Sequence, residues 1–292
     1  MASPLVEEWT GHDVTLGEVE DELARLRDAS AVEGGNPNQR TSVMTHVAWV
    51  PQDWLDAAER TLEGLAERHP SRTVILVPCA EESEARLDAE VSVRCFPAGD
   101  HAVCGEVIEL RLCGSRAAAP ASIVLPLVIS DLPVFLRWRG EPVFGEPQWE
   151  QLIDVADRVI VDSAEWSDLS YAALARAFER TAVSDIAWAR TYPWRVELAE
   201  YWPQIKKQEI AIRGPRAEAT LLNGWLSARL GRAIPAGEPA GELGVRLGGE
   251  DVRSPRDDVL SPSDLLSAEL DHFGRDRIYE EALLATAESQ GV

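Results

Sequence analysis

Hydrophobic residues along this chain recur at two spacings, which separate the expected strands from the expected helices. Apolar runs, unbroken or alternating with polar residues, are typical of strands. We expect strands at residues 41–50, 72–77, 87–95, 103–112, 133–138, 158–161, 208–213 and 245–247. Apolar residues three and four positions apart mark the inward face of a helix. We expect one helix to begin at Thr15, and others at 52–69, 117–130, 149–155, 166–181, 215–230, 263–272 and 277–287.

The order of these segments predicts the fold class. A strand at 41–50, a helix at 52–69 and a buried strand at 72–77 form a β-α-β unit, which favours a right-handed crossover and a parallel strand pair. Further strands alternate with helices after it. The prediction is an α/β fold, with a mixed sheet that combines parallel β-α-β units with one antiparallel hairpin. A helical corner and a smaller α+β C-terminal part complete it.

The expected hairpin fixes which residues face each other across its two strands. With Gly99-Asp100 as a two-residue turn, Cys95 lies opposite Cys104 and Asp88 lies opposite Arg111. The same register places Glu90 opposite Glu109, and two like charges there count against it. Cys95 and Cys104 are therefore redox candidates. We favour two reduced, half-buried thiols, with a disulfide as the alternative.

Composition suggests three parts. Residues 1–39 are an acidic helix followed by a linker rich in Gly, Asn and Pro at 29–39, and the helix begins with a Thr15–Glu18 capping box. We expect its apolar stripe to dock on the protein's own body, because a lone amphipathic helix of this length is marginal. Residues 40–205 form the expected main α/β domain. The expected C-terminal α+β region is 206–292, where composition shifts to Gly, Pro and acid.

The segment 184–202 is rich in aromatic and arginine side chains. Ser184 or Asp185 can cap a short helix there, and Pro193 favours the start of a second one. Two short helices therefore meet at a corner that carries Trp188, Arg190, Tyr192, Trp194 and Arg195. Tryptophan and arginine dominate the energetic centres of protein interfaces. The alternative is that the corner packs on the fold's own core, because Trp is buried in most folds.

Charge and composition exclude several classes of function. The chain has 292 residues, a hydrophobic fraction of 45% and a formal net charge of −22. Such a charge repels nucleic acid and anionic membranes. The sequence lacks an apolar run long enough to span a bilayer, and its start has no signal-peptide pattern. Four cysteines without tight pair spacing fit a reducing compartment. We expect a cytoplasmic protein that binds neither nucleic acid nor membrane.

A search for catalytic and cofactor motifs leaves few candidates. The sequence contains no glycine-rich phosphate loop, no nucleophile elbow and no histidine or cysteine pair at metal-ligand spacing. We therefore expect neither a metal nor a cofactor. Asp162-Ser163 follows a strand, where α/β sheets bind ligands, but we favour it as the cap of the next helix. Arg137-Trp138-Arg139-Gly140, at another strand end, suits a phosphate or carboxylate, or a salt-bridged rim.

Several sequence stretches together resemble one protein family. They are R-T-S-V-M-T at 40–45, H-P-S-R at 69–72, F-L-R-W-R-G-E-P at 135–142, A-D-R-V-I-V-D-S at 156–163, D-I-A-W-A-R-T-Y-P-W-R at 185–195, L-L-N-G-W-L-S-A-R-L-G at 221–231 and R-I-Y-E-E-A-L at 277–283. In this order they resemble the OpcA family of glucose-6-phosphate dehydrogenase assembly proteins. Two features depart from the family pattern. Arg137 stands where the family motif has a first Trp, and the region after Gly231 is short.

The resemblance implies a non-enzymatic cytoplasmic protein that binds glucose-6-phosphate dehydrogenase. It would assist that enzyme's assembly or act as its allosteric activator in the oxidative pentose phosphate pathway. The candidates for contact with the partner are Arg137, Trp138, Arg139, Asp185, Trp188, Arg190, Trp194 and Arg195. Some members of the family are linked to redox control through thioredoxin, which makes thioredoxin a second, weaker candidate partner.

The alternative function is a sugar-phosphate-binding enzyme. In it, Arg137, Arg139 and Arg190 hold the phosphate, and Asp162 or Asp185 serves as general base. A closed pocket where these side chains converge would favour this reading. A dehydrogenase scaffold without any effect on the enzyme's kinetics is a third hypothesis.

Overall fold

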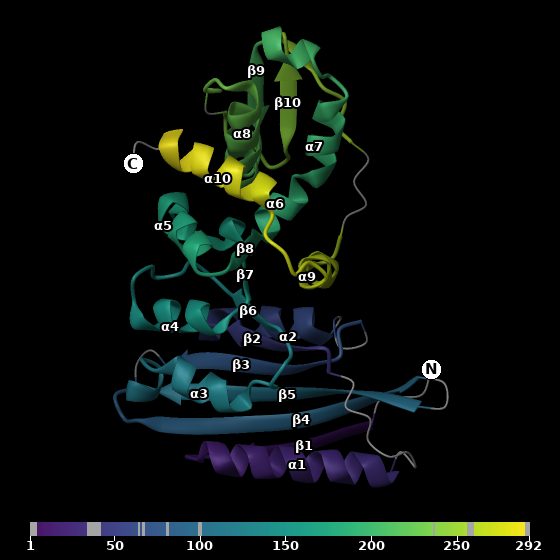
Figure 1. The fold of residues 1–292 in the computed structure, drawn as a ribbon, viewed down its shortest axis with the longest axis vertical. Coiled ribbons are helices and arrows are strands. Elements are labelled where there is room, and N and C mark those ends of the chain that lie inside the picture. Colours follow the sequence, from purple (N-terminus) through teal and green to yellow (C-terminus); the bar gives the residue numbers. More distant parts are fainter. Residues whose placement is uncertain are drawn as a thin grey trace.

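The computed structural model describes residues 5–33, 42–63, 65, 68–79, 82–98, 101–235, 237–255 and 260–289. Within these ranges the chain forms an eight-stranded sheet, a separate three-stranded sheet and helices around both. Figure 1 shows the large sheet in the lower and middle part of the molecule and the small sheet at the top. The fold is mixed α/β, as predicted.

The large sheet is parallel over most of its width. Its strands, in spatial order, are β1 (Leu5–Gly11), β4 (Arg86–Ala98), β5 (His101–Cys113), β3 (Ser71–Cys79), β2 (Met44–Trp49), β6 (Val134–Trp138), β7 (Arg158–Val161) and β8 (Ala182–Asp185). Neighbours from β5 to β8 run parallel, whereas β4 and β1 run antiparallel to their neighbours. The predicted β-α-β unit is confirmed, because β2 and β3 pair in parallel.

The chain changes direction across the sheet between β2 and β6. After β2 it continues on one side, to β3, and later returns to the other side of β2 for β6, β7 and β8. The two central strands β2 and β6 are hydrogen-bonded neighbours. Such a reversal is a topological switch point, and α/β sheets bind ligands outside the carboxyl ends of the strands there.

Helices cover both faces of the large sheet. One face carries α1 (Leu16–Glu33), α3 (Pro120–Leu127), α4 (Pro147–Val155) and α5 (Tyr171–Ala175), whose apolar residues form one large core with the strands. The other face carries α2 (Leu55–Glu63), preceded by the 3₁₀ turn Gln52–Trp54, and α9 (Pro262–Leu270). The helix predicted at 52–69 is thus a turn and a shorter helix within the described residues.

The register of the predicted hairpin is confirmed. Cys95 pairs with Cys104, Asp88 with Arg111 and Glu90 with Glu109 across β4 and β5. The like-charged pair is tolerated because Arg111 lies 3.2 Å from Glu109 and partly offsets its charge. The expected turn, 99–100, lies outside the described residues.

The N-terminal segment contributes a strand that the sequence did not predict. β1 pairs with β4 along the outer edge of the sheet, and α1 packs back on β4. The predicted capping box is present: Thr15 N donates to Glu18 Oε2 at 2.8 Å, and Glu18 N donates to Thr15 Oγ1 at 3.3 Å. Val19, Leu23 and Leu26 are buried, so the helix does dock on its own protein. Most of the expected linker, from 34 onward, lies outside the described residues.

The helix predicted at 166–181 is wrong in its first half. The chain instead has a 3₁₀ turn at Ser163–Glu165, then α5 and a second 3₁₀ turn at Arg176–Glu179. Glu141 Oε2 accepts hydrogen bonds from Ser167 N at 3.0 Å and Asp168 N at 3.2 Å in the non-helical segment before α5. Asp162 therefore caps a short turn, through Ala164 N at 3.2 Å, and not a helix from Trp166.

The C-terminal part forms the small sheet and its helices. The sheet consists of β11 (Glu250–Asp251), β10 (Gly244–Leu247) and β9 (Ile210–Arg213), and the helices are α6 (Ile186–Arg190), α7 (Tyr192–Ala199), α8 (Arg216–Leu230) and α10 (Arg277–Ser289). α8 ends at Gly231, whose positive φ of 64° is the left-handed cap predicted for it. α10 contacts both α8 and α5. The division at 39 and 205 stays a prediction.

Candidate functional site

A hollow lined by four arginines opens beside the switch point of the large sheet. Its volume is about 440 Å³. We call it the arginine hollow and define it by its charged residues Arg60, Arg137, Arg139, Asp162, Glu165 and Arg190, together with Ala57, Thr61, Ile186, Ser261, Pro262, Ser263 and Leu266. These residues come from α2, the ends of β6 and β7, α6 and the start of α9. Figure 1 shows α2, α6 and α9 around this part of the sheet.

Glu165 joins the two arginines at the end of β6. Arg137 Nη2 donates to Glu165 Oε1 at 2.7 Å, and Arg137 also donates to the carbonyl of Trp138. Arg139 Nε lies 3.1 Å from the same glutamate oxygen, at an angle that leaves Nε without a hydrogen bond. Gly140 N donates to Glu165 Oε2 at 2.7 Å. One carboxylate thus serves two buried guanidinium groups.

Arg139 is the less satisfied of these two arginines. Its guanidinium carbon lies 4.8 Å from the ring centroid of Trp54, a cation–π contact. Burial, and next the charge of Arg137, lowers the pKa of Arg139, whereas Glu165 and Asp162 raise it. Its charged form is therefore stabilised less than that of an exposed arginine. An added anion in the hollow would relieve this deficit.

Arg190 and Asp162 form the second charged pair of the hollow. Arg190 donates to both carboxylate oxygens of Asp162, at 2.9 and 2.7 Å. Glu218 lies 3.4 Å from the same guanidinium group. The hydrogen bonds to Asp162 and its charge raise the pKa of Arg190 against the opposing effect of burial, which is the largest single influence. Both oxygens of Asp162 are engaged by Arg190, so Asp162 is poorly placed to act as a base.

Asp185 is buried and does not line the hollow. Its Oδ1 accepts hydrogen bonds from Ser163 N at 3.0 Å and Ala187 N at 2.9 Å, so it is the residue that caps α6. Its Oδ2 is buried without a hydrogen-bond partner among the described residues. Burial, and then the charge of Asp162, raises the pKa of Asp185 to about 7. Its role in this structure is to join the ends of β7 and β8.

The aromatic corner between α6 and α7 is partly core and partly surface. Trp188 and Trp194 are buried, and Trp188 Nε1 donates to Asp276 Oδ2 at 3.0 Å. The Arg195 guanidinium lies 3.6 Å from the Trp188 ring centroid and 5.5 Å from that of Tyr192. Burial lowers the pKa of Arg195 to about 10.

The outer side of the same corner is exposed. Tyr192 is 62% exposed and Val196, one helical turn later, is 48% exposed. We call this pair, with Arg195 beside it, the α7 surface. Of the predicted contact residues, Arg137, Trp138, Arg139, Asp185, Trp188 and Trp194 are buried, and Arg190 and Arg195 are half-buried. Burial leaves their predicted role in partner binding untested.

Comparison with known proteins shows similarity over part of the chain. A family model described as "Glucose-6-phosphate dehydrogenase subunit N-terminal domain" matches residues 63–178. A protein of Synechocystis sp., named "Putative OxPP cycle protein OpcA", is 27% identical over 184 residues, which cover 57% of this chain and 38% of that protein. A protein of the same name from Nostoc punctiforme is 27% identical over 189 residues, covering 59% of this chain and 40% of its own length.

Over these residues the chain is similar to the OpcA proteins. It spans about two fifths of the length of the curated relatives that it matches. The matched region contains Arg137, Arg139, Asp162 and Glu165, whereas Arg60 precedes it and Arg190 follows it. In the described ranges of the chain, no helix is both long and apolar enough to cross a bilayer.

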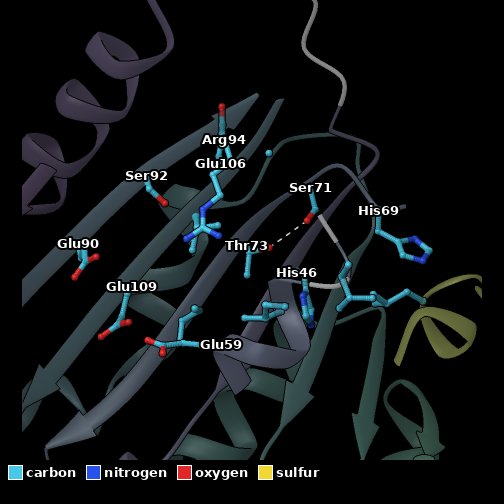
Figure 2. Close-up of a pocket in the computed structure, with 16 residues that line it drawn as sticks. His46, Glu59, His69, Ser71, Thr73, Glu90, Ser92, Arg94, Glu106 and Glu109 are labelled. Carbon is cyan, nitrogen blue, oxygen red and sulfur yellow. Dashed lines mark hydrogen bonds between the residues drawn. The ribbon is translucent and has the colours of Figure 1, made fainter. Parts of the chain in front are cut away.

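A second hollow, of about 240 Å³, lies between α2 and the sheet face formed by β3, β4 and β5. Figure 2 shows Glu59, Glu90 and Glu109 on one side of it and His46 and His69 on the other. Burial, and next the charges of Glu90 and Glu59, raises the pKa of Glu109, although Arg111 lowers it. This hollow is mixed in charge and has no basic cluster comparable to the arginine hollow.

The histidines of this second hollow were missed by sequence reasoning. His69 Nε2 lies 2.7 Å from Ser267 Oγ. Next to His69, Ser71 Oγ lies 3.1 Å from Thr73 Oγ1 (Figure 2). His46 is fully buried, and its Nε2 has no partner among the described residues. Burial, and then Arg137 and His69, lowers the pKa of His46 to about 4. Nothing in the local sequence signals this, because the neighbours come from distant segments.

The four cysteines of the chain are paired. Cys95 and Cys104 form a disulfide with an S–S distance of 2.12 Å, so the expectation of two reduced thiols is wrong and the alternative is confirmed. Cys79 and Cys113, which the sequence did not pair, form a second one at 2.17 Å. They lie beside Glu82, but paired sulfurs are not available as metal ligands. A redox role for Cys95 and Cys104, and a cytoplasmic location, stay predictions.

Proposed function

We propose that this chain acts with glucose-6-phosphate dehydrogenase as a non-catalytic assembly factor and allosteric activator in the oxidative pentose phosphate pathway. The observation that carries the proposal is the match of residues 63–178 to a domain whose description names that enzyme. The relatives' name places them in the OxPP cycle. The proposed setting is the cytoplasm, where this pathway's soluble enzymes would meet the protein.

The α7 surface is the contact site that we propose. Tyr192 and Val196 are exposed one helical turn apart on α7, and the Arg195 guanidinium group contacts the rings of both Tyr192 and Trp188. Aromatic and arginine side chains are enriched in protein interfaces. In this arrangement the buried Trp188 and Trp194 support the surface from below, and the exposed residues meet the partner.

Activation requires the protein to distinguish two states of its partner. A binding protein shifts an equilibrium only by the difference in its affinity for the two states. We therefore propose that the chain binds the active assembly of the dehydrogenase more tightly than the inactive one. Equal affinity for both states would give a stable complex with unchanged kinetics, which is the scaffold hypothesis.

The test is a titration of the dehydrogenase from the same organism with this protein. Enzyme activity and light scattering after size exclusion are measured on the same samples. The proposal expects a saturable rise in turnover or substrate affinity, together with a co-eluting complex. A complex without a kinetic effect would leave the scaffold and exclude the activator. No complex at micromolar concentration would exclude both. An unrelated dehydrogenase serves as the control for non-specific effects.

One observation favours sugar-phosphate binding, which is one part of the alternative function as a sugar-phosphate-binding enzyme. Arg137, Arg139 and Arg190 do line one hollow, as a sugar-phosphate site requires. Catalysis with Asp162 or Asp185 as general base has less support, because Asp162 is hydrogen-bonded to Arg190 and Asp185 does not line the hollow. Incubation of the protein alone with sugar phosphates, followed by product analysis, tests this alternative. Turnover above that of the D162N variant would favour the enzyme.

A further inference from the structure

The arginine hollow has the position and size of a small-molecule site. It lies outside the carboxyl ends of β6 and β7, beside the switch point between β2 and β6. Open α/β sheets bind their ligands at this place because the strand ends and the following loops diverge there. Its volume of about 440 Å³ falls within the range of pockets that hold small ligands.

The charge of the hollow favours an anion. Four arginines line it against two carboxylates, Asp162 and Glu165, in a chain whose formal net charge is −22. Arg60 is exposed at its edge, and within the described ranges no carboxylate lies at ion-pair distance from it. The buried Arg139 shares its carboxylate with Arg137 and has a hydrogen-bond donor, Nε, without an acceptor. Two guanidinium groups are therefore incompletely compensated.

A third donor comes from the first turn of α9. Ser261 caps this nine-residue helix. The amides of Asp264 and Leu265 are bonded to Ser261 Oγ and Ser261 O, at 3.1 and 3.0 Å. In the part of the chain that the structure describes, the amide of Ser263 has no acceptor. A free amide at a helix N-terminus is a favourable donor to an anion, since the helix dipole adds to it.

The rest of the lining suits the carbon part of a ligand. Ala57, Ile186, Pro262 and Leu266 supply apolar surface next to the charged residues. A free inorganic ion would leave this surface unused. A phosphate group attached to a small organic molecule uses both parts, because guanidinium groups bind phosphate oxygens through paired hydrogen bonds.

We propose that the arginine hollow is a binding site for a small phosphate monoester. Arg60, Arg139 and the Ser263 amide bind its phosphate, and the apolar residues contact its organic part. The site binds without chemical turnover, because the hollow holds no unengaged base among the described residues. This proposal does not depend on the proposed role with the dehydrogenase. Failure of either proposal would leave the other unaffected.

The test is calorimetric titration of the full chain at low ionic strength with inorganic phosphate, glucose 6-phosphate and glucose. We expect glucose 6-phosphate to bind about tenfold more tightly than inorganic phosphate, and glucose not to bind. Equal binding of the two phosphates would reduce the site to a general anion site and overturn the proposal. Absence of binding by both at millimolar concentration would overturn it as well.

Matched variants locate the binding. R60Q removes an exposed arginine that has no carboxylate at ion-pair distance among the described residues, and it is expected to weaken monoester binding about five- to tenfold. R229Q removes an exposed arginine on α8, outside the hollow, and is expected to have no effect. S263P removes the α9 amide where a helix tolerates proline, whereas S263A keeps it. The proposal expects weakening in S263P and not in S263A. Equal losses in R60Q and R229Q would show diffuse attraction only.

Discussion

The carboxylate of Asp162 receives both hydrogen bonds that Arg190 can direct at it, one to each oxygen, at 2.9 and 2.7 Å. Asp162 follows β7 and is buried, whereas the Arg190 side chain, at the end of α6, is 35% exposed. The pair fixes the aromatic corner to the carboxyl edge of the large sheet. It also leaves Arg190 less available to a ligand than Arg60 or Arg139.

Arg190→Gln is expected to lower the free energy of unfolding by about 2 kcal/mol. A buried carboxylate that loses its cation costs about 3–5 kcal/mol, and the partial exposure of Arg190 reduces that loss. Urea denaturation, followed by tryptophan fluorescence, measures the change. Arg229→Gln removes an exposed ion pair with Glu281 and is expected to cost less than about 0.5 kcal/mol. Equal small losses in both variants would contradict the structural role of the pair.

Asp185 makes stability depend on pH in the direction opposite to most carboxylates. Its folded-state pKa is raised from 3.8 to about 7, so between these values the native state holds a proton that the unfolded chain releases. Stability therefore falls as pH rises from about 4 to 7, by up to about 1.4 kcal/mol per pH unit. The unfolding free energy of D185N, which still accepts the two amide hydrogen bonds, is expected to lack this fall. If the unfolding free energies of the wild type and D185N change with pH in parallel, Asp185 is not the cause of the fall.

His46 acts in the opposite sense over nearly the same pH range. Its pKa is lowered from 6.5 to about 4, so the unfolded chain binds a proton that the native state does not. Its contribution is present above pH 6.5 and is lost as pH falls towards 4. The two effects offset each other in the wild type. H46Q alone should therefore show a steeper fall with rising pH than the wild type.

Gly224 of α8 and Thr286 of α10 are in close contact. A Cβ on Gly224 would lie 2.0 Å from Thr286 Oγ1 and 2.4 Å from the backbone oxygen of Ala282. Gly224→Ala is thus expected to destabilise by about 2 kcal/mol, although alanine normally favours a helix by about 1 kcal/mol. The double variant Gly224→Ala/Thr286→Ala should recover only part of the lost stability, because the clash with the Ala282 carbonyl oxygen remains. Gly241→Ala, where no atom lies within 4 Å, is the control.

The two disulfides are expected to differ in their contribution to stability. Cys79–Cys113 closes a sequence separation of 34 residues and Cys95–Cys104 one of 9. Loop entropy predicts that removing them costs about 4 and about 3 kcal/mol, respectively. Urea denaturation of the two paired Cys→Ser variants tests this order. Alkylation of the denatured, unreduced protein should detect no free thiol, and four reactive thiols in protein purified without reductant would contradict both pairings.

Local pattern was sufficient for the regular parts of the fold. The strand at 158–161 and the hairpin register were predicted correctly, because an unbroken apolar run and strict alternation each permit one reading. β8, at Ala182–Asp185, was missed because four residues between two helical segments carry too short a pattern. The helix predicted from Trp166 begins instead at Tyr171, and the Ser167 and Asp168 amides before it bond to the side chain of Glu141, a contact that the local sequence does not show.

In the candidate site, too, some features could be predicted from the local sequence and others depend on tertiary contacts. From their place at a strand end, Arg137 and Arg139 were predicted either to bind a phosphate or carboxylate or to form a salt-bridged rim. Their sharing of Glu165, and the addition of Arg60 and of α9 to the same hollow, depend on how distant segments pack. The aromatic corner was located correctly, but its sequence does not show which side faces solvent. Tyr192 and Val196, not Trp188, are its exposed members.

The α7 surface yields the last prediction. Val196→Glu places a charge at the centre of the proposed contact, and an unpaired charge is costly in a desolvated interface. We expect it to raise the dissociation constant for glucose-6-phosphate dehydrogenase at least about tenfold, and Tyr192→Ala to have a similar effect. Val143→Glu adds the same charge at an apolar residue that is 64% exposed elsewhere, and it should not alter binding. Thermal unfolding of each variant separates loss of binding from loss of fold. If Val143→Glu weakens the complex and Val196→Glu does not, the dehydrogenase binds a different face.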